Sequence, residues 1–440
     1  MAFATSHNGV SGNVNDLLDT SPQNAVNINE IRARFPGLPE GTALFNNAAG
    51  TVVLKDAIES ASKLMQSMPM PGGSDTKSME AIHAYQKNKA TVAGFLNAGT
   101  DEITFGQSTT CLFRLLGISL KPLLSSDCEI VCSSLCHEAM ASAWIRLARD
   151  LGATIKWWSP NQDDPDDPRL SIERLQQLLT PKTRIVTCNH VSNVIGSIHP
   201  IRAVARLVHQ NPGCMLMVDG VACVPHRAVD VKALEVDFYC FSWYKVFGPH
   251  LATLYASRRA QDRYMTSLNH FFVPSGSLDG KLALGMPSFE MQSMCGPIVR
   301  YLQDFVGWET IVRQETLLTR IVLDHLLSKP AVYRVFGRRV SDPTQRVSII
   351  TFEVRGQQSG DVVSRINARN RVRIVAGECL APRPTRDVLK PESSDGLIRV
   401  SIVHYNTVQE AETLCDELDL VLAEMQSEVR SPSWAAEKSK

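Results

Sequence analysis

The sequence has no excess of charge of either sign. Its 440 residues include 45 Lys and Arg against 45 Asp and Glu, so the formal net charge is zero. Proteins that bind nucleic acid or anionic membranes electrostatically usually carry a basic patch or a basic excess. The balanced composition gives no such signal, and we expect neither nucleic acid nor a membrane among the partners.

Long apolar runs are also missing. No stretch approaches the roughly 18 apolar residues of a membrane-spanning helix. The first 28 residues are rich in Asn, Ser and Thr and contain no apolar segment typical of a signal peptide. We expect residues 1–28 to form a disordered tail and residues 426–440 to form a second tail.

The cysteines lack the close spacing of metal ligands. There are eleven, and many lie inside apolar runs, as do Cys132, Cys188, Cys214 and Cys240. Free buried thiols in a large neutral protein indicate a reducing compartment. We therefore expect a cytoplasmic protein without a metal site.

What the sequence does contain is an alternation of short apolar runs with amphipathic segments. Residues 129–133, 184–188, 214–219 and 236–241 are continuously apolar enough for buried strands. Helical periodicity separates them, as in the segment 140–151, which ends before Gly152. This alternation predicts right-handed βαβ units and a doubly wound α/β domain.

The pattern changes near Gly296. A long helical stretch covers residues 298–327, with a possible break at Gly307. Beyond it, three further strands and a last helix predict a smaller α+β domain, whose expected elements are 347–354, 372–376, 397–403 and 408–425. We expect a large domain at 29–297, of which 29–55 could pack on the small domain, and a small domain at 298–425. The segment 383–395, rich in proline and charge, is predicted to be a surface loop.

Two charged residues stand at expected strand ends. Lys245 follows the apolar run 236–241, and Asp219 closes the run before it. In open α/β sheets, ligands bind at the carboxyl edge of the strands. A buried lysine there can form an imine with an aldehyde cofactor, and an acid can hold a protonated ring nitrogen. A surface lysine and a capping acid are the alternatives.

Three further elements follow strand ends. Ser108 and Thr109 open a helix, where hydroxyls and free N–H groups suit a phosphate, although both are ordinary capping residues. His137 begins the next helix and could stack on a pyridine ring or act as a cap. Asn193 lies in the segment 190–196 and could contact a ring hydroxyl or stabilise a turn. Each signal alone is modest, but the order of hydroxyl-rich turn, His, Asn, Asp and Lys is far more specific.

This order resembles the class V aminotransferase family, also called the cysteine desulfurase-like group of fold-type I enzymes, over residues 29–425. The resemblance implies pyridoxal 5′-phosphate as cofactor and a large domain with a mostly parallel seven-stranded sheet. It implies that Lys245 carries the cofactor as a Schiff base, that Asp219 pairs with the ring nitrogen and that His137 stacks on the ring. It also assigns Asn193 to the ring hydroxyl and Ser108, Thr109 and Ser242 to the phosphate.

The resemblance further implies a substrate site. Arg399 matches the arginine that grips the α-carboxylate, because a guanidinium binds a carboxylate bidentately. Asn47 and His404 are further candidates for substrate contact. Met286, in a segment that usually completes the site of the opposite subunit, implies a homodimer with shared active sites.

The chain departs from the family pattern at two cofactor positions. Tyr244 replaces the histidine that often precedes the lysine, and Ala222 replaces a glutamine that usually helps to bind the ring hydroxyl. Asn193 would then bind that hydroxyl alone.

The chain is more similar to one fungal branch of secondary metabolism within this family. That branch implies a decarboxylative aldol addition, in which L-aspartate loses its side-chain carboxylate as carbon dioxide. The remaining carbon adds to an aldehyde and gives a γ-hydroxy-α-amino acid. Water must be excluded, because protonation at that carbon gives alanine instead.

Three other functions remain open at this point. A cysteine desulfurase or C–S lyase would use Cys379 as a nucleophilic thiol of low pKa, but Glu378 beside it would raise that pKa. An aminotransferase or epimerase would exchange the amino group or invert Cα without releasing carbon dioxide. A binding protein that kept the fold would need a dead site, whereas Lys245, Asp219, Asn193 and Arg399 are all present.

Overall fold

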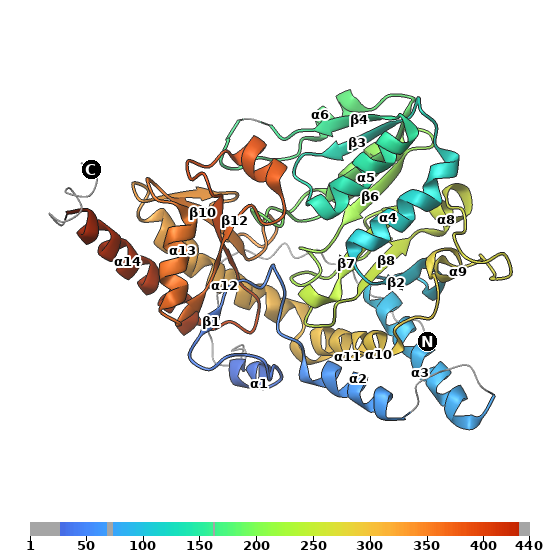
Figure 1. The fold of residues 1–440 in the computed structure, drawn as a ribbon, viewed down its shortest axis with the longest axis horizontal. Helices are drawn as coiled ribbons and strands as arrows, with labels where there is room; N and C mark the ends of the chain where they lie inside the picture. Colours follow the sequence, from blue (N-terminus) through green and yellow to red (C-terminus); the bar gives the residue numbers. More distant parts are fainter. Residues whose placement is uncertain (1–26, 68–73, 162, 431–440) are drawn as a thin grey trace, which may run out of the picture.

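The computed structural model describes residues 27–67, 74–161 and 163–430. Within them the chain forms a larger α/β region and a smaller α+β region, joined by a long helix that runs along one side of the molecule (Figure 1). Most of the tail expected at residues 1–28 lies outside the described residues, and helix α1 (Ile28–Arg32) begins at the end of that segment.

The large domain is built on a seven-stranded sheet, as the family resemblance implies. Its strand order is β2-β8-β7-β6-β5-β3-β4, and only β8 runs against the others. The strands are β2 (Ile103–Gly106), β3 (Glu129–Ser133), β4 (Thr154–Trp158), β5 (Thr183–Asn189), β6 (Met215–Asp219), β7 (Phe238–Ser242) and β8 (Ala252–Ala256).

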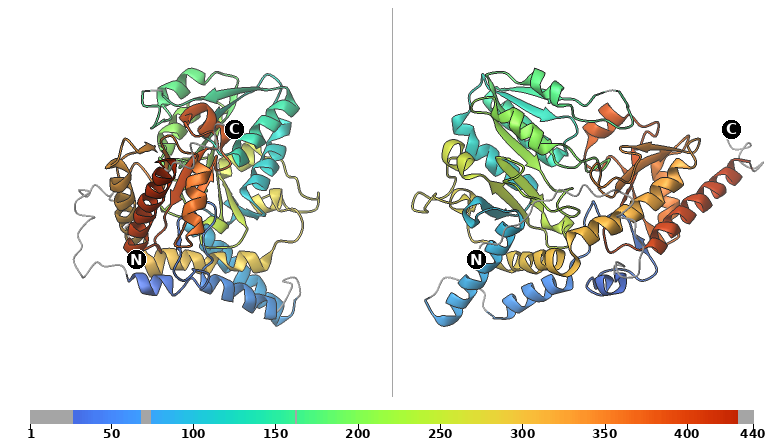
Figure 2. Two further views of the ribbon diagram at one scale, coloured as in Figure 1. Left: turned by 60° about the vertical axis from the view of Figure 1, so that its left-hand side comes forward. Right: turned by 180° about the vertical axis from the view of Figure 1, so that it is seen from behind.

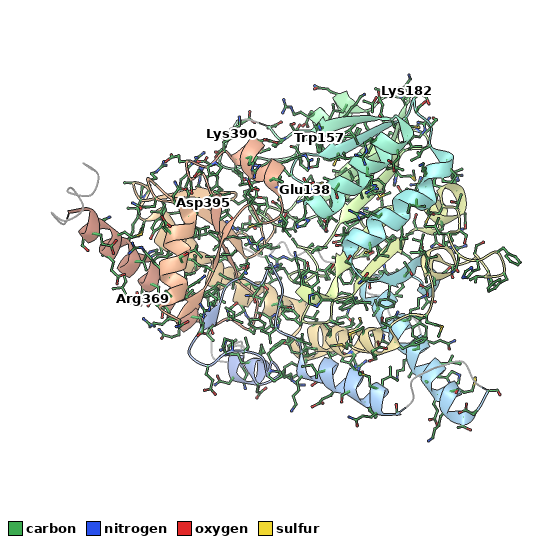
Figure 3. All side chains as sticks on the ribbon, viewed as in Figure 1. Glu138, Trp157, Lys182, Arg369, Lys390 and Asp395 are labelled. Carbon is green, nitrogen blue, oxygen red and sulfur yellow. The ribbon has the colours of Figure 1, made fainter. Side chains whose placement is uncertain are left out.

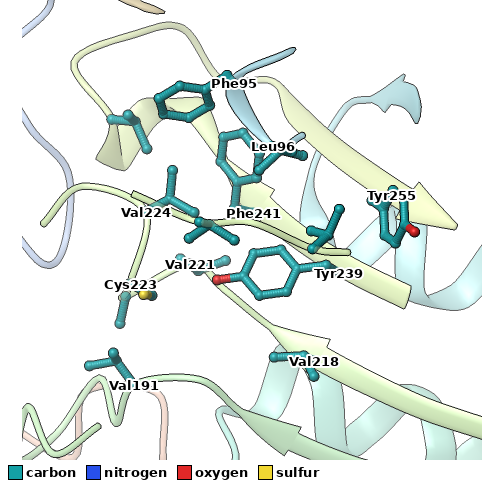
Figure 4. Packing of buried hydrophobic residues seen from close by; sticks show 14 of the residues in the cluster. Phe95, Leu96, Val191, Val218, Val221, Cys223, Val224, Tyr239, Phe241 and Tyr255 are labelled. Atoms are coloured by element: carbon teal, nitrogen blue, oxygen red, sulfur yellow. The ribbon is translucent and has the colours of Figure 1, made fainter. Parts of the chain in front are cut away.

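Both faces of this sheet are covered. Alternate residues of one strand enter different apolar clusters, so Tyr239 and Phe241 pack on one face while Phe238 and Cys240 pack on the other. Figure 4 shows the first of these clusters, in which Phe241 packs near Phe95 and Leu96. Burial on both faces explains why these strands are continuously apolar rather than alternating.

The helices of the large domain lie on the two faces and below the sheet. Helices α4 and α5 cover one face, and α7 lies on the other. The helical elements are α2 (Lys55–Ser67), α3 (Thr76–Phe95), α4 (Thr109–Leu120), α5 (Glu138–Leu151), α6 (Ile172–Leu178), α7 (Ile201–His209), α8 (Arg258–Tyr264), α9 (Leu278–Leu282), α10 (Phe289–Ser293) and α11 (Cys295–Arg300), with 3₁₀ turns η3 (Thr100–Glu102) and η4 (Lys121–Leu123).

The small domain has its own sheet and core. The antiparallel sheet has the order β12-β13-β10-β9, and β1 pairs in parallel with β11. Residues Ala43 and Phe45 join the core of this domain, so the N-terminal segment packs on it. The elements are β1 (Ala43–Leu44), α12 (Trp308–Leu327), β9 (Tyr333–Phe336), β10 (Ile349–Val354), α13 (Ser359–Ala368), β11 (Val372–Arg373), β12 (Val375–Gly377), β13 (Leu397–Ser401) and α14 (Val408–Arg430). Helix α14 continues beyond residue 425, where we expected a tail, and residues 431–440 lie outside the described part.

The connection between the domains is interrupted where the sequence indicated a break. A π-helical segment η6 (Tyr301–Val306) follows α11, and Gly307 adopts φ 80° before α12 begins. A positive φ of this size favours glycine. The view from behind in Figure 2 shows α12 leading from the large domain into the small one.

One expectation about the small domain was wrong. Residues Arg383–Leu389, predicted as part of a surface loop, form the π-helix η7, which ends at Lys390 with φ 48°. Pro384, Thr385 and Leu389 are buried on its inner side. The charge and proline content gave no sign of this helix, because Leu389 is buried against residues outside the segment, namely Val194 and Ile195 of the large domain and Phe336 and Leu397 of the small one.

Among the described residues, no helix combines the length and apolarity needed to cross a membrane. The same residues contain no group of three or more His, Cys, Asp or Glu side chains arranged to hold a metal ion.

Candidate active site

Asp219 is the last residue of β6, at the carboxyl edge of the sheet. Its backbone carbonyl accepts a hydrogen bond from the N–H of His190 at 2.8 Å, and its Oδ1 accepts one from the N–H of Val221 at 2.9 Å. Burial raises the pKa of the carboxyl to about 6, although the Val221 N–H and the Lys245 charge lower it. Above that pH the side chain is a buried carboxylate suited to a cationic partner.

The turn after Asp219 allows no side chain. A Cβ atom on Gly220 would lie 2.0 Å from Cε1 of Tyr239, so the tyrosine ring occupies that space. In Figure 4 the Tyr239 hydroxyl points toward Cys223 beneath this turn. The hydroxyl also meets Nδ1 of His190 at 3.0 Å. The ring and its partners thus fix the backbone that presents Asp219.

Lys245 lies in the 3₁₀ turn η5 (Trp243–Lys245) directly after β7. Only 8% of the residue is exposed, and within the described residues its amine has no ion pair or hydrogen bond. Burial and the charge of Arg399 lower the pKa of the amine to about 8, while Asp219 acts in the opposite direction. A buried, unpaired lysine is rare and indicates a chemical role rather than a structural one.

His137 caps helix α5. Its Nδ1 accepts a hydrogen bond from the N–H of Ala139 at 3.0 Å, so the neutral ring carries its proton on Nε2. Burial, together with the charges of Lys245 and Arg399, lowers the pKa of the imidazole to about 4. His137 therefore has the helix-capping role that the sequence left open. This role holds its neutral imidazole in place near Lys245.

Arg399 enters the site from the middle of β13 in the small domain. Its Nη1 donates to the carbonyl of Asn193 at 3.0 Å, and its Nη2 donates to Oδ1 of Asn46 at 3.4 Å. Its Nε is buried without a partner, and no carboxylate within the described residues pairs with it. The guanidinium is therefore held by neutral groups and retains its charge for an anionic ligand.

Asn193 connects the two domains. Its side-chain amide donates to the carbonyl of Cys379 at 3.0 Å, and its Oδ1 is buried without a partner. Next to it, Gly196 has φ 72°, and a Cβ there would lie 2.6 Å from the carbonyl oxygen of Ile349. The unpaired Oδ1 needs a hydrogen-bond donor that the described residues do not provide.

Hydroxyl groups gather at the N-terminus of α4. Ser108 is the N-cap and accepts a hydrogen bond from the N–H of Cys111. The Oγ of Ser242, at the end of β7, lies 3.4 Å from Oγ1 of Thr109. Two elements far apart in sequence thus bring their hydroxyls together beside free N–H groups, which is the arrangement that binds phosphate.

These unmet groups fit pyridoxal phosphate. An unpaired amine, a buried carboxylate, an orphaned amide oxygen and a hydroxyl cluster at a helix N-terminus match its aldehyde, ring nitrogen, ring hydroxyl and phosphate. Lys245, Asp219, Asn193 and the Thr109–Ser242 pair would hold those four groups, and His137 would lie on the ring.

Tyr244 and Ala222 are also close to this set. Tyr244 is half-buried, and its ring stacks on His250 with centroids 5.1 Å apart. The Lys245 amine lies 5.6 Å from the same ring. Ala222 is buried and has no polar group, so it cannot replace the glutamine of the family pattern.

The structure does not bring every expected ligand to the site. Asn47 donates to Ser401 and Asn406 and accepts from Tyr405, so its polar atoms are occupied within the protein. His404 is fully buried behind Phe247, and its Nε2 meets the Tyr301 hydroxyl at 2.6 Å. Their residue types suited a ligand role, but tertiary contacts use both side chains for packing.

Met286 lies in the loop between α9 and α10. It follows Gly285, which has φ 78°, and 66% of it is exposed. Within a single chain it contacts no substrate site, so any role in catalysis depends on a second subunit.

Cys379 lies in a strained loop of the small domain that contacts Asn193. Cys379 and Leu380 both adopt φ 53°, a left-handed conformation that side chains disfavour. Burial raises the pKa of the thiol, although Arg399 and Lys245 lower it. The Cys379 carbonyl is bound to Asn193, and the Leu380 carbonyl accepts from the N–H of Glu138 at 3.1 Å. The loop is thus fastened to the large domain, and its thiol is protonated at neutral pH.

Sequence reasoning missed two site residues. Asn46 contacts Arg399, whereas its neighbour Asn47 was selected. Glu138 forms an ion pair with Arg383 across the domain junction. The Asn-Asn pair was visible in the sequence, but only the register of the 43–47 segment on β13 determines which amide faces the arginine.

The comparisons with known proteins agree with this geometry. Residues 43–414 match the family model described as Aminotransferase class-V. The chain is 68% identical over 416 residues to the cysteine desulfurase-like protein ustD of Aspergillus flavus, covering 94% of this chain and 95% of that protein. It is 56% identical over 394 residues to the nonribosomal peptide synthetase-like enzyme fsqF of Aspergillus fumigatus, covering 89% of this chain but 26% of that protein.

A solved structure shares the fold. The apo cysteine desulfurase of Thermococcus onnurineus superimposes with a TM-score of 0.80 at 23% identity, covering 90% of this chain and 98% of that one. At this identity the likeness shows the architecture alone.

Proposed function

The chain belongs to the aminotransferase class-V family, whose members depend on pyridoxal phosphate, and from that premise we propose that it is a decarboxylative aldolase. In the proposed reaction, the bond between Cβ and the side-chain carboxylate of L-aspartate breaks, and carbon dioxide leaves. The electron pair that remains at Cβ forms a bond to the carbonyl carbon of an aldehyde. A proton on the former carbonyl oxygen completes a γ-hydroxy-α-amino acid.

The bound cofactor would supply an electron sink conjugated with Cα of the substrate. Asp219 favours a protonated ring nitrogen, because a buried carboxylate is stabilised by a cationic partner. His137, fixed as a neutral ring by its bond to Ala139, would cover one face of the cofactor ring without adding charge. These residues support cofactor chemistry but do not select a substrate.

Lys245 would move a proton at Cα. Its pKa of about 8 leaves a useful fraction of neutral amine near neutral pH, which a general base requires. The nearby Arg399 contributes to this low pKa and would itself bind the α-carboxylate. Arg399 would thus both orient the substrate and lower the pKa of Lys245, the proposed base.

The observation that carries the proposal is that two basic side chains considered for the substrate side-chain carboxylate, Arg383 and His404, are both engaged elsewhere within the described residues. Arg383 is engaged by Glu138, and His404 is enclosed behind Phe247. A carboxylate held by a firm ion pair would be stabilised against leaving, whereas one left in an apolar, partly closed site is destabilised.

The cysteine desulfurase alternative requires a mobile thiolate. Cys379 is the candidate for this thiolate, but burial raises the pKa of its thiol. Its backbone carbonyl also accepts a hydrogen bond from the side chain of Asn193. A protonated thiol in a fastened loop is a poor nucleophile. This observation favours the aldol reaction over sulfur transfer.

The assigned reaction can be tested with L-aspartate labelled at the side-chain carboxylate. Incubation of the holoenzyme with an aromatic aldehyde should release labelled carbon dioxide and yield a γ-hydroxy-α-amino acid in equal amounts, measured by mass spectrometry. Alanine as the only product, or faster release of sulfide from L-cysteine, would contradict the proposal.

We also infer a homodimer with shared sites, in a cytoplasmic enzyme of fungal secondary metabolism of the ustiloxin type. The apolar side chains of Phe271, Phe272, Leu284 and Met286 are all exposed within one stretch of the chain, which supports a partner there. The cysteines are free, which supports a reducing location. Light scattering on the holoenzyme should give twice the chain mass, and Met286→Asp should reduce it to the monomer value.

A further inference from the structure

A pocket lies at the domain junction, and none of the proposed cofactor-binding residues lines it. It is a cavity of about 550 Å³ between the loop after β4 and helix η7 of the small domain. Figure 3 shows Trp157 and Lys390, which line it, at the upper edge of the molecule near Glu138. The volume is within the roughly 300–1,000 Å³ of typical small-molecule sites.

The walls of this pocket are held at a fixed separation. Arg334 of β9 pairs with Asp166 at 2.7 Å, and Arg338 pairs with Asp167 at 3.2 Å. The N–H of Gly337 also donates to the carbonyl of Asp166 at 2.6 Å. Because these residues join the loop after β4 to the small domain, the pocket is preformed rather than created by binding.

The lining combines a flat aromatic surface with rigid apolar walls. Trp157 is 36% exposed, and the guanidinium of Arg383 lies 4.8 Å from its ring centroid. Pro160 and Pro168 also line the pocket and supply rigid apolar surface. An aromatic ring can stack on the tryptophan or on the guanidinium plane.

The polar groups of the pocket can recognise an acid and an amide. Lys390 lines the pocket, and among the described residues its ammonium has no hydrogen bond or ion pair. The carboxylate of Asp387 and the side chain of Asn161 also line it. A ligand carboxylate can pair with Lys390, and a ligand amide N–H can donate to Asp387. Asp387 repels a second negative charge, so a single carboxylate placed toward Lys390 suits the lining best.

The pocket adjoins the active site through Glu138. Arg383 in its wall pairs with Glu138, which directly follows His137. The N–H of Glu138 also donates to the carbonyl of Leu380, in the loop that carries Cys379.

We propose that this pocket binds the part of the aldehyde co-substrate that is remote from its carbonyl, and that this part is an aromatic, amide-containing group with one carboxylate. The inference rests on the proposed aldol function, whose co-substrate it defines. The enzyme would thus bind its two substrates at separate sites. Arg399 would bind the aspartate, and Trp157 and Lys390 would bind the part of the aldehyde that is remote from its carbonyl.

The test compares three aldehydes with the holoenzyme and L-aspartate. They are benzaldehyde, N-(para-formylbenzoyl)-L-phenylalanine and the carboxamide analogue of the latter. Trp157→Ala should raise KM for both extended aldehydes on the order of tenfold and leave benzaldehyde unchanged, while Trp157→Phe should restore most of the loss. Lys390→Gln should raise KM about three- to tenfold for the carboxylate alone.

A matched control is Lys182→Gln, at an exposed site far from the pocket, as Figure 3 shows. It should alter no KM. Equal effects of Trp157→Ala on benzaldehyde and on the extended aldehydes would overturn the proposal, as would equal effects of Lys390→Gln on the carboxylate and the carboxamide.

Binding is measured independently by calorimetry with the unreactive alcohol N-(para-hydroxymethylbenzoyl)-L-phenylalanine. Weaker binding to Trp157→Ala than to the unmodified holoenzyme supports the site, and equal binding refutes it. If no aldehyde gives a γ-hydroxy-α-amino acid with the unmodified enzyme, the aldol function fails, and the calorimetry still decides whether the pocket binds such a group.

Discussion

The two halves of the proposed active site are built differently. On the cofactor side, Asp219, Lys245 and Ser242 stand at strand ends, and His137 and Thr109 stand at helix starts. On the substrate side, Arg399, Asn46 and the Cys379 loop come from the small domain and its N-terminal partner segment. The first half is fixed by local secondary structure, whereas the second depends on contacts between domains.

This difference suggests a division of roles, in which the strand-end groups serve the cofactor chemistry and the loops determine substrate specificity. Groups at strand ends keep their positions as long as the sheet is intact, so they suit a cofactor whose chemistry is shared within a family. Loops with left-handed residues can change with little effect on the core, so they suit recognition of a particular substrate. Variants on the cofactor side should therefore change the spectrum of the holoenzyme, whereas variants on the substrate side should change KM.

The largest expected effect is that of Lys245→Ala. The variant should lose the visible absorbance of the bound cofactor and at least about 10³-fold of the decarboxylation rate, because no other described amine is buried at the site. Absorbance spectra and release of labelled carbon dioxide measure both. Lys182→Ala serves as the control, and retention of full activity in Lys245→Ala would refute its assigned role.

Asp219→Asn should have the next largest effect. The amide keeps the shape but removes the charge, so the rate should fall on the order of a hundredfold or more while the cofactor stays bound. The absorbance maximum should shift as the ring nitrogen loses its proton. An unchanged spectrum with an unchanged rate would show that Asp219 does not contact the ring.

Arg399→Lys should separate the two halves of the site. The lysine keeps the charge but loses the bidentate geometry, so KM for aspartate should rise roughly 10- to 100-fold. The spectrum without substrate should remain that of the unmodified holoenzyme. A change of spectrum with normal KM would place the arginine on the cofactor side instead.

A smaller effect concerns His137 and acid stability. Its pKa is lowered to about 4 from a value of 6.5, so the unfolded chain binds its proton at a higher pH than the folded one. Its contribution to folding stability is therefore complete above the unfolded value and falls as pH decreases between the two values. The loss is at most about 1.4 kcal/mol per pH unit.

His137→Phe removes this titration and keeps a ring at the position. Chemical unfolding followed between pH 7 and pH 5 should therefore show a smaller loss of stability for the variant than for the unmodified protein. Asp219, whose pKa is raised to about 6, contributes in the opposite direction in both proteins. Identical pH dependence would show that the imidazole is not buried in solution.

The smallest expected effect is that of Cys379→Ala. Because the proposed reaction needs no thiol, kcat and KM for aspartate should change by less than about threefold, the range of a modest packing change. Measured rates with aspartate and aldehyde provide the test. Complete loss of turnover would favour the sulfur-transfer alternative.

Much of the cofactor side could be predicted from the sequence. Asp219, Lys245 and His137 each follow an apolar run that could be recognised as a strand, and parallel strands bring such ends to one edge. The interruption at Gly307 was also visible, because a glycine at positive φ is a local property. The helix η7 was not, because Pro384 and Leu389 are buried by residues distant in the chain.

The substrate side was predicted in part. The family resemblance pointed to Arg399, but the sequence could not distinguish Asn46 from Asn47, since only their pairing with β13 decides which amide faces the guanidinium. His404 was expected near substrate, and its pairing with Tyr301 could not be foreseen across a separation of 103 residues.

The sequence by itself determined the class of chemistry in this protein, because buried strands followed by Lys, Asp, His and Asn impose their own order at a sheet edge. The tertiary structure alone decided which charges stay free. Arg383 is neutralised by Glu138, and Arg399 is held by neutral carbonyl and amide oxygens. Charge pairing depends on distances between domains, and no local pattern encodes those distances.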